Sequence, residues 1–494
     1  MGVVTEGAKD VTEHRTLPIF PFTKAAEGVE DVMLGANLKE GQVAQINQVL
    51  KQYSSVFSDQ PGSSNVLDLT SDEPVCSMPY KLQYTTRKSL KNNIDGMLGM
   101  RVIWESNFSN ASPVVIVKKP DGPNCKCIDY RKLNKVTVFD PEPMTTAEDL
   151  FQKLTNDRYF SKLDLSKGYW QIPVAEQDIE KTAFVTPDGH FEFLKMPFGM
   201  INSAATLVRA MRHVFQGLEN VDNYIDDIII HTKTWIEHLE VLKEVFVRLE
   251  KAGFSIRPTK CQLGELNIEF IGHSIKQGVL QPLDDNVKRI LDAPRPTTKT
   301  QVRSFNGLAG YYRDFIPNYS AIAAPLTDLT KKGQPNHVNW GPAQQKAFDT
   351  LKKMITEKPI LRIPDISRPF VLRTDASNIG LGAVLLQPYD GQYFPVSYAS
   401  RKLLDREKNY SAIEKEGLAL VWAVEKFRQY LYGIEFTLQT DHRPLVYINS
   451  AKFENSRVMR WALMLQNYRI HMESIKGSDN FGADYMSRVE SVFE

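Results

Sequence analysis

Two adjacent aspartates, Asp226 and Asp227, lie inside the run Asn223–Ile230, whose other residues are mainly Tyr and Ile. Aromatic and β-branched residues favour strands. Because neighbouring side chains of a strand point to opposite faces, one of the two carboxylates would face the protein core. A buried carboxylate without a partner costs on the order of several kcal/mol or takes up a proton. The run therefore predicts a tight hairpin with both aspartates at its tip and a cation beside at least one of them. An Asp-rich surface turn is the alternative.

A third carboxylate, Asp164, lies in similar surroundings within the segment Phe160–Trp170. Asp164 and Asp226 form the pair of acids that two-metal phosphoryl transfer requires. In that chemistry two Mg²⁺ ions about 3.5–4 Å apart activate the attacking hydroxyl and stabilise the leaving oxygen. Mg²⁺ prefers oxygen ligands, usually one or two carboxylates together with substrate phosphates.

The motif Tyr224-Ile225-Asp226-Asp227 resembles the catalytic tetrad of reverse transcriptases, and the blocks around it resemble the gypsy-type branch of LTR retrotransposons. The resemblance covers residues from about 80 to 490. It implies an α+β fold: a right-hand polymerase with fingers, palm and thumb, followed by an α/β ribonuclease H-like domain. It also implies that Asp164, Leu165 and Asp226 bind the metals and that Asp227 supports them.

Domain borders follow from the same resemblance. We expect an N-terminal linker or extension at 1–75, fingers and palm at 76–278, a thumb at 279–340, a connecting segment at 341–365 and ribonuclease H at 366–494. No Asp-Thr-Gly or Asp-Ser-Gly motif marks a protease, and no His/Cys module or integrase is expected.

Composition is that of an ordinary soluble globular protein, with 42% hydrophobic and 24% charged residues among 494. No apolar run approaches the roughly 18 residues of a membrane span, and the N-terminus lacks a signal-peptide core. The four cysteines, Cys76, Cys125, Cys127 and Cys261, lack disulfide or zinc spacing, which favours reduced thiols and an intracellular protein. By resemblance we expect a cytoplasmic location, in virus-like particles. A net charge of +1 shows no basic excess, but Lys and Arg crowd between Lys81 and Lys135.

A hairpin predicted from Ala111 to Asn134 turns at Asp121-Gly122, a strong turn signal. Lys118 and Lys119 near its tip suit a mobile clamp on nucleotide phosphates, or alternatively guard an edge strand against aggregation. Lys126 follows on the return strand. Relatives commonly have Trp-Arg on this strand where this chain has Asn124-Cys125, and a thiol cannot replace the bidentate donors of arginine.

Three further residues are expected at the nucleotide by resemblance. Tyr169 is implied to be a steric gate against a ribose 2′-hydroxyl, although a core tyrosine beside Trp170 is the simpler interpretation. Phe198 and Gly199 belong to the block 196–203 that frames the nucleotide and the template base. Ser203 is expected to cap the helix that follows, and Gly217 to close it.

Nucleic-acid contacts are expected on two further segments and at Tyr224. The segment Phe270-Ile271-Gly272-His273 resembles the hairpin that grips the primer end, and it is also compatible with a core strand. Pro294 and Pro296 separate two thumb helices. Lys299 and Arg303 on the second helix would track a duplex backbone or simply face solvent.

A second set of acids begins at Asp375, near the end of a predicted strand. In the predicted helix 411–432, Ser411 and Glu414 form a capping box. Glu416 lies in an apolar stripe, where a carboxylate is costly without a partner such as a metal; a surface glutamate at the edge of the stripe is the alternative. Asp441 ends a second strand, and Asp484 follows downstream. The four resemble the Asp-Glu-Asp-Asp set of ribonuclease H, which binds two Mg²⁺ ions, for which Mn²⁺ would substitute.

These features predict an RNA- and DNA-dependent DNA polymerase with ribonuclease H activity. Its partners would be an RNA template, a DNA primer, dNTPs and RNA–DNA hybrid, without a membrane, and the protein would be a monomer or a homodimer. One alternative is a decayed or domesticated relative that binds nucleic acid without catalysis, which Cys125 favours. Another is a polymerase whose ribonuclease H domain only binds duplex.

Overall fold

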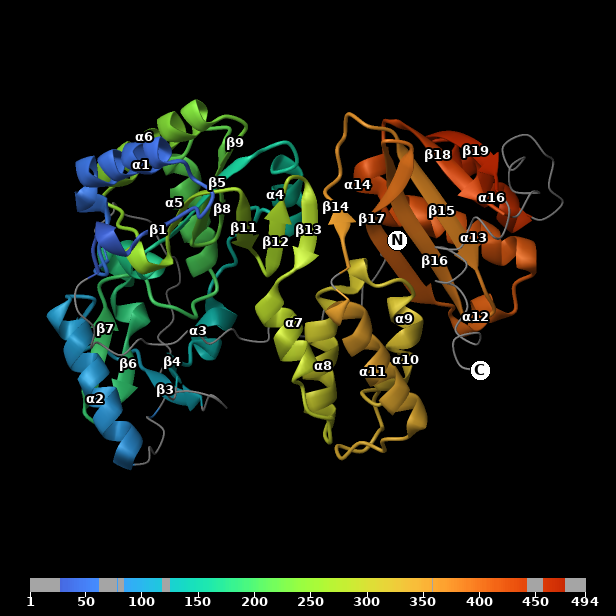
Figure 1. The fold of residues 1–494 in the computed structure, drawn as a ribbon. Coiled ribbons are helices and arrows are strands. Elements are labelled where there is room, and N and C mark those ends of the chain that lie inside the picture. Colours follow the sequence, from blue (N-terminus) through green and yellow to red (C-terminus); the bar gives the residue numbers. More distant parts are fainter. Residues whose placement is uncertain are drawn as a thin grey trace. The chain divides into compact units, whose positions relative to one another are not determined.

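The computed structural model describes residues 27–61, 78, 84–117, 125–357, 359–441 and 456–475. The chain forms two compact units, one from 1–150 and 157–266 and the other from 151–156 and 267–494 (Figure 1). The boundary at Leu266 precedes the expected end of the palm, and the domain borders given above stay predictions.

The first unit contains a sheet in the order β1-β10-β5-β9-β8. The strands are β1 (Met33–Leu34), β10 (Gln262–Glu265), β5 (Tyr159–Asp164), β9 (Asp227–Thr232) and β8 (Val221–Tyr224). The helices α1 (Glu40–Gln52), α5 (Ser203–Val214) and α6 (Trp235–Ala252) contribute to its core. The side chains of Ile228 and Ile230 on β9 and of Phe246 on α6 are fully buried there. Strand β9 is therefore anchored in the core directly after Asp227.

A second sheet of the same unit has the order β2-β7-β6-β3-β4. Its strands are β2 (Ile103–Glu105), β7 (Gly189–Phe193), β6 (Phe184–Thr186), β3 (Ser112–Val117) and β4 (Cys125–Ile128). Helix α2 (Tyr84–Gly99) packs on it, and α3 (Arg131–Val136) follows β4. Helix α4 (Ala147–Lys153) crosses from the first unit into the second.

The second unit begins with the sheet β11-β12-β13-β14 and a group of helices. The strands are β11 (Asn267–Phe270), β12 (His273–Lys276), β13 (Val279–Pro282) and β14 (Leu361–Arg362). The helices are α7 (Asp284–Leu291), α8 (Lys299–Gly310), α9 (Tyr319–Ile322), α10 (Ala324–Asp328) and α11 (Pro342–Thr356). Pro294 and Pro296 lie between α7 and α8, where proline cannot continue a helix.

The rest of the second unit is built on the sheet β17-β16-β15-β18-β19. The strands are β15 (Phe370–Ala376), β16 (Gly380–Tyr389), β17 (Gln392–Lys402), β18 (Glu435–Thr440) and β19 (Arg469–Ser474). The helices are α12 (Asp405–Lys408), α13 (Ala412–Lys426), α14 (Arg428–Leu431) and α16 (Ser456–Leu465). Because β15 pairs in parallel with β18, the carboxyl ends of both strands lie at one edge of the sheet.

Three local expectations need correction. Apolar residues at three- to four-residue spacing predict one helix from Leu38 to Phe57. In the structure this helix, α1, ends at Gln52, and a short 3-10 turn follows at Ser54–Val56. Ser203 does not cap α5: it is the first helical residue, and its hydroxyl donates to the Pro197 carbonyl. The helix expected at 411–432 is interrupted at Phe427, where α13 ends and α14 begins.

No helix in the described ranges is both long and apolar enough to cross a membrane. Cys261 is a free, buried thiol, as expected for it.

Candidate active sites

The first candidate site lies where β5 and β9 run side by side. The two strands are antiparallel, and Asp164 at the end of β5 pairs with Asp227 at the start of β9. Asp226 lies in the turn between β8 and β9, next to Ile225, whose φ of +59° is unusual for a β-branched residue. The Leu165 amide donates to the Asp226 carbonyl at 3.4 Å. The fold thus brings the three acids together from two strands and the intervening turn.

Burial and mutual repulsion make this cluster electrostatically costly. Asp164 is 9% exposed, and burial raises its pKa, although Lys260 opposes that effect. Burial raises the pKa of Asp226 to about 6, and the negative charges of Asp227 and Asp164 add to the shift. Such raised values indicate carboxylates that lack enough positive charge, which a bound divalent cation would supply.

Two lysines partly compensate the acids. Lys260 Nζ lies 2.8 Å from Asp164 Oδ2, and Lys162 Nζ lies 3.3 Å from an oxygen of Asp227. The sequence analysis missed both. Lys162 could have been found, because it is two residues before Asp164 and therefore shares its face of the strand. Lys260 is 96 residues away in sequence and gives no local signal.

The predicted nucleotide residues are only partly described. Tyr169 is 7% exposed and packs edge-on against Phe198, with 4.9 Å between ring centroids. Burial, and next the charge of Asp226, raise the pKa of Tyr169. Gly199 has a φ of +92°, and its carbonyl accepts a hydrogen bond from Asn134. These residues lie between Asp164 and Asp226 in sequence and share their unit.

The basic residues of the β3–β4 hairpin cannot be placed. Lys118 and Lys119 lie outside the described residues, between the two strands. Lys126 pairs through its backbone with Ile116, but its side chain is outside the described part, as is that of Cys125. Their roles stay predictions.

The expected primer-end hairpin is present in the second unit as β11 and β12. Ile271 and Gly272 form its tip, with φ values of +44° and +68°. Phe270 is 1% exposed and His273 is 6% exposed, so both side chains belong to the core. The His273 ring stacks on Phe315 at 5.6 Å. This burial agrees with the core-strand alternative, and the contact of this segment with nucleic acid stays a prediction.

The remaining nucleic-acid predictions fall on accessible positions. Tyr224 is the last residue of β8 and is half-buried. Arg303 on α8 is exposed and Lys299 is half-buried, and their side chains donate to the backbone carbonyls of Thr330 and Lys331. The structure is therefore compatible with contact at these positions and with the solvent-facing alternative.

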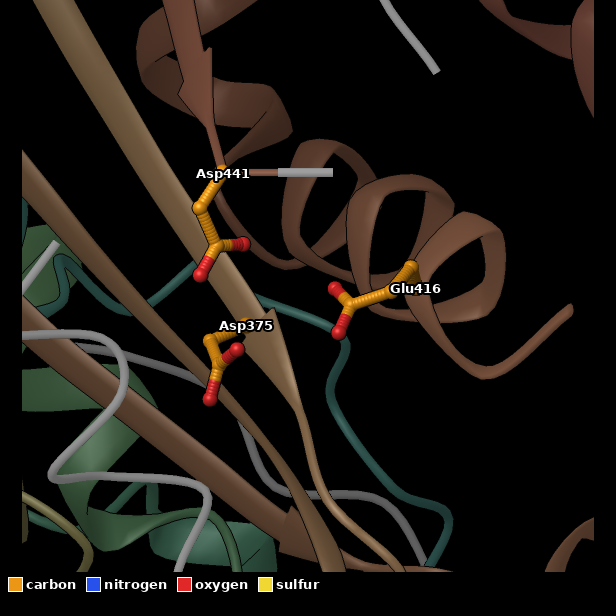
Figure 2. Close-up of side chains that lie close together, drawn as sticks. All are labelled: Asp375, Glu416 and Asp441. Carbon is orange, nitrogen blue, oxygen red and sulfur yellow. The ribbon is translucent and has the colours of Figure 1, made fainter. Parts of the chain in front are cut away.

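The second candidate site contains Asp375, Glu416 and Asp441, with one ligand oxygen from each lying within 4.8 Å of the others (Figure 2). Asp375 is on β15, Glu416 is on α13, and Asp441 directly follows β18. It is the one such group of three potential ligands within the described ranges. The first cluster, Asp164, Asp226 and Asp227, does not meet that distance criterion. Asp484, the fourth predicted acid, lies outside the described residues.

Local contacts fix Glu416 in this group. The Ala376 amide donates to Glu416 Oε1 at 3.3 Å, which ties α13 to the end of β15. The capping box is present as expected, because the Ser411 amide donates to Glu414 Oε2 at 2.8 Å and Ser411 Oγ accepts from the Glu414 amide. Glu416 therefore has a separate role from the cap. A set of three carboxylates fits hard cations such as Mg²⁺ or Mn²⁺.

Comparison with family models gives two matches. Residues 117–275 match the model described as reverse transcriptase (RNA-dependent DNA polymerase), and residues 365–468 match the RNase H-like domain found in reverse transcriptase. The first match contains Asp164, Asp226 and Asp227, and the second contains Asp375, Glu416 and Asp441.

Whole-chain relatives agree with both matches. The chain is 41% identical to the retrovirus-related Pol polyprotein from transposon 297 of Drosophila melanogaster, over 86% of this chain and 40% of that polyprotein. It is 32% identical to the Pol polyprotein from transposon opus of the same species, covering 92% and 48%, and 34% identical to the Tf2-3 polyprotein of Schizosaccharomyces pombe, covering 83% and 31%. Residues 117–275 thus belong to the reverse transcriptase family, and residues 365–468 belong to the family of RNase H-like domains found in reverse transcriptases. The gypsy-type resemblance is thereby confirmed.

The chain spans less than half the length of these Pol polyproteins. Solved structures support the fold of this chain. A foamy viral protease-reverse transcriptase in complex with RNA/DNA hybrid has a TM-score of 0.76 at 23% identity, covering 91% of this chain and 62% of that one. A second, in complex with double-stranded DNA, has a TM-score of 0.78 at 24% identity, covering 90% and 95%. The expected fold class, a polymerase followed by a ribonuclease H-like domain, is confirmed.

Proposed function

We propose that this chain extends a primer with dNTPs on RNA or DNA templates and hydrolyses the RNA strand of RNA–DNA hybrids. The observation that carries the proposal is the presence of two separate acidic sites, each inside its own family match. Asp164, Asp226 and Asp227 meet at the β5–β9 edge, and Asp375, Glu416 and Asp441 meet in the second unit.

Asp164, Asp226 and Leu165 would hold Mg²⁺ in the polymerase, with Asp227 in support, and Asp375, Glu416, Asp441 and Asp484 would hold it in the ribonuclease H. We propose two ions per site, with Mn²⁺ as a substitute. When bound, Mg²⁺ supplies charge stabilisation at the reacting phosphate and activates the attacking hydroxyl or water. The raised pKa of Asp226 supports this assignment, because a carboxylate short of positive charge gains most from a cation.

Neighbouring residues would position the substrates. Tyr169, packed edge-on to Phe198, presents a rigid ring that would exclude a ribose 2′-hydroxyl. Lys118, Lys119 and Lys126 would neutralise the triphosphate, and Gly199 would lie beside the base. The primer–template would be contacted by Tyr224, by the tip residues Ile271 and Gly272, and by Lys299 and Arg303 on α8. We propose a cytoplasmic protein that acts as a monomer or a homodimer.

The first experiment is deoxythymidine incorporation on poly(rA)/oligo(dT) with Mg²⁺, together with cleavage of a labelled RNA–DNA hybrid. We expect Asp226→Asn to abolish incorporation and spare cleavage, and Asp375→Asn to do the reverse. Each variant is thus the folding control of the other. A native chain that binds duplex but performs neither reaction would contradict the proposal.

One observation favours a second candidate, a nucleic-acid-binding protein without synthesis. This chain has Asn124-Cys125 on the strand where relatives commonly have Trp-Arg. Cys125→Arg decides between the two: an inactive native chain that Cys125→Arg activates has lost its triphosphate contact, whereas an active native chain tolerates the thiol.

A further inference from the structure

The end of β15 and the turn that follows it contact helix α13 at two adjacent residues of the helix, Lys415 and Glu416. The Ala376 amide donates to Glu416 Oε1 at 3.3 Å, and Lys415 Nζ donates to Asn378 Oδ1 at 2.8 Å. Asn378 is three residues after Asp375, and Lys415 directly precedes Glu416. The Asn378–Lys415 pair therefore lies beside two of the three acids shown in Figure 2.

Lys415 is an unusual residue for its position. It is 8% exposed and lies in the first turn of α13, where the helix dipole disfavours a positive charge. Lysine is rarely buried unless an acid pairs with it, yet its hydrogen-bond partner is the neutral amide of Asn378. Helix stability therefore does not explain this lysine, and its contact with Asn378 is the feature that sets it apart.

The ammonium fixes the orientation of the Asn378 amide. An ammonium group has only donors, so the atom that faces it must be the amide oxygen. The two N–H donors of Asn378 consequently point away from Lys415, and Asn378 is exposed. The turn itself is rigid, since Ser377 Oγ accepts from the amides of Ile379 and Gly380, both at 3.1 Å. A Cβ on Gly380 would lie 2.9 Å from the Arg401 carbonyl, so the backbone at Gly380 packs closely against that of β17.

We propose that Asn378 donates a hydrogen bond to a 2′-hydroxyl of the RNA strand and that Lys415 positions Asn378 for it; this rests on the proposed ribonuclease H function. The 2′-hydroxyl is the group by which a protein distinguishes RNA from DNA. A neutral amide suits a hydroxyl, whereas phosphates are usually bound by Arg or Lys directly. The positive charge behind the amide oxygen polarises the group and strengthens its N–H donors.

The test combines variants with modified substrates. Single-turnover cleavage is measured on a short RNA–DNA hybrid and on copies in which one ribonucleotide at a time, around the cleavage site, is replaced by its 2′-deoxy form. Asn378→Ala should slow cleavage of the unmodified hybrid by roughly tenfold, the usual effect of one lost hydrogen bond. At one position the 2′-deoxy substitution should slow the native chain by a similar factor and leave Asn378→Ala with no further loss.

Two controls exclude general damage. Primer extension by Asn378→Ala should equal that of the native chain, because the polymerase acids lie in the other unit. Gln392→Ala removes an exposed amide from β17 of the same sheet and should leave cleavage of every substrate unchanged.

Lys415 is tested as a positioning residue. Lys415→Met should reproduce the loss seen for Asn378→Ala, including its disappearance on the same 2′-deoxy substrate, and should add nothing in the double variant. Lys426→Met, at the exposed end of the same helix, should have no effect. A Lys415→Met loss that persists on that substrate, or multiplies with Asn378→Ala, would overturn the positioning role.

Three other outcomes overturn the proposal. If the Asn378→Ala and 2′-deoxy losses multiply at every position, Asn378 does not contact a 2′-hydroxyl, although the ribonuclease H assignment survives. If Asn378→Ala causes no further loss on a substrate with one methylphosphonate, but does on every 2′-deoxy substrate, the amide contacts a phosphate. If the native chain cleaves no unmodified hybrid, the proposed function fails together with this inference.

Discussion

Lys260 Nζ lies 2.8 Å from Asp164 Oδ2, and this ion pair neutralises one of the acids before any metal is bound. Burial raises the pKa of Asp164, and Lys260 is the strongest effect that opposes it. Lys260→Met should therefore make Asp164 easier to protonate. We expect primer extension to fall by roughly tenfold or more at pH 6.5 and by less at pH 8.5, where the carboxylate is again ionised.

Lys162→Met is the matched control for Lys260→Met. Its partner Asp227 is more exposed, with 28% of its side chain accessible against 12% for Asp164. The loss for Lys162→Met should thus depend less on pH. Equal losses at both pH values for Lys260→Met would show that its charge does not act through Asp164.

The ionised form of Asp226 should lower the stability of the folded protein. Because burial raises its folded-state pKa to about 6, the folded protein binds this proton more tightly than the unfolded chain does. Stability from this group is therefore present at low pH and is lost as pH rises from about 4 to 6. Asp226→Asn removes the charge. We therefore expect it to raise the free energy of unfolding at pH 7.5 without Mg²⁺ by on the order of 2 kcal/mol, measured as a higher unfolding temperature, while primer extension is lost.

The same thermal scans at pH 4.5 and with Asp95→Asn complete that test. At pH 4.5 the native Asp226 is largely protonated, so the gain from Asp226→Asn should shrink. Asp95 is exposed on α2, and its substitution should change little. An Asp226→Asn protein that is less stable than the native chain at pH 7.5 would contradict the electrostatic argument.

How far the sequence predicts this protein depends on whether the signal is local. Apolar residues at helical spacing predict a helix from Trp235 to Ala252, and α6 has these bounds, because its apolar stripe is continuous and Gly253 ends it. The hairpin carrying Asp226 and Asp227 and the strand ending at Asp164 were also predicted, since apolar β-branched residues flank each acid. In contrast, the extension of the first helix beyond Gln52 overlooked Ser54 and Ser55, which favour turns.

Two features gave no usable local signal. Strand β17 was not predicted: it lies at the edge of its sheet, contains Pro395 near an irregularity in its pairing with β16, and is mostly half-buried. The Lys260–Asp164 and Lys415–Asn378 contacts join residues 96 and 37 positions apart, so only the fold reveals them. The acids were predictable from type and order, and Lys162 from its spacing to Asp164, whereas the distant Lys260 and Lys415 contacts were not.

His231 should stabilise the first unit in a pH-dependent way. Its ring bridges Asp157 at 2.6 Å and Asp222 at 3.1 Å. Burial would lower its pKa, but these two acids together raise it above the ordinary 6.5. The stabilisation is thus complete below pH 6.5 and is lost as pH rises through the raised folded-state value. His231→Gln should cost about 3 kcal/mol at pH 6 and less at pH 8.5, measured by thermal unfolding.

His238→Gln provides the comparison for His231→Gln. His238 is also buried, and burial followed by repulsion from His231 lowers its pKa to about 4, so it is neutral at both pH values. Its ring contacts Ser161 at 2.7 Å and Thr232 at 3.0 Å. The cost of His238→Gln should therefore be the same at pH 6 and pH 8.5. A cost of His231→Gln that is equally independent of pH would mean that the imidazole is not charged.

A side chain at Gly272, at the tip of the β11–β12 hairpin, should lower stability and displace the tip. Its φ is +68°, and an added Cβ would lie 3.1 Å from both Asn286 Nδ2 and Tyr311 Cε1. Gly391 has a similar φ of +79° but open space around it, so Gly391→Ala isolates the backbone strain, about 1 kcal/mol. Gly272→Ala should cost more and displace the tip, raising the KM for primer–template severalfold while hybrid cleavage is retained. If the two variants match in unfolding temperature and KM, the contacts beneath the tip do not position it.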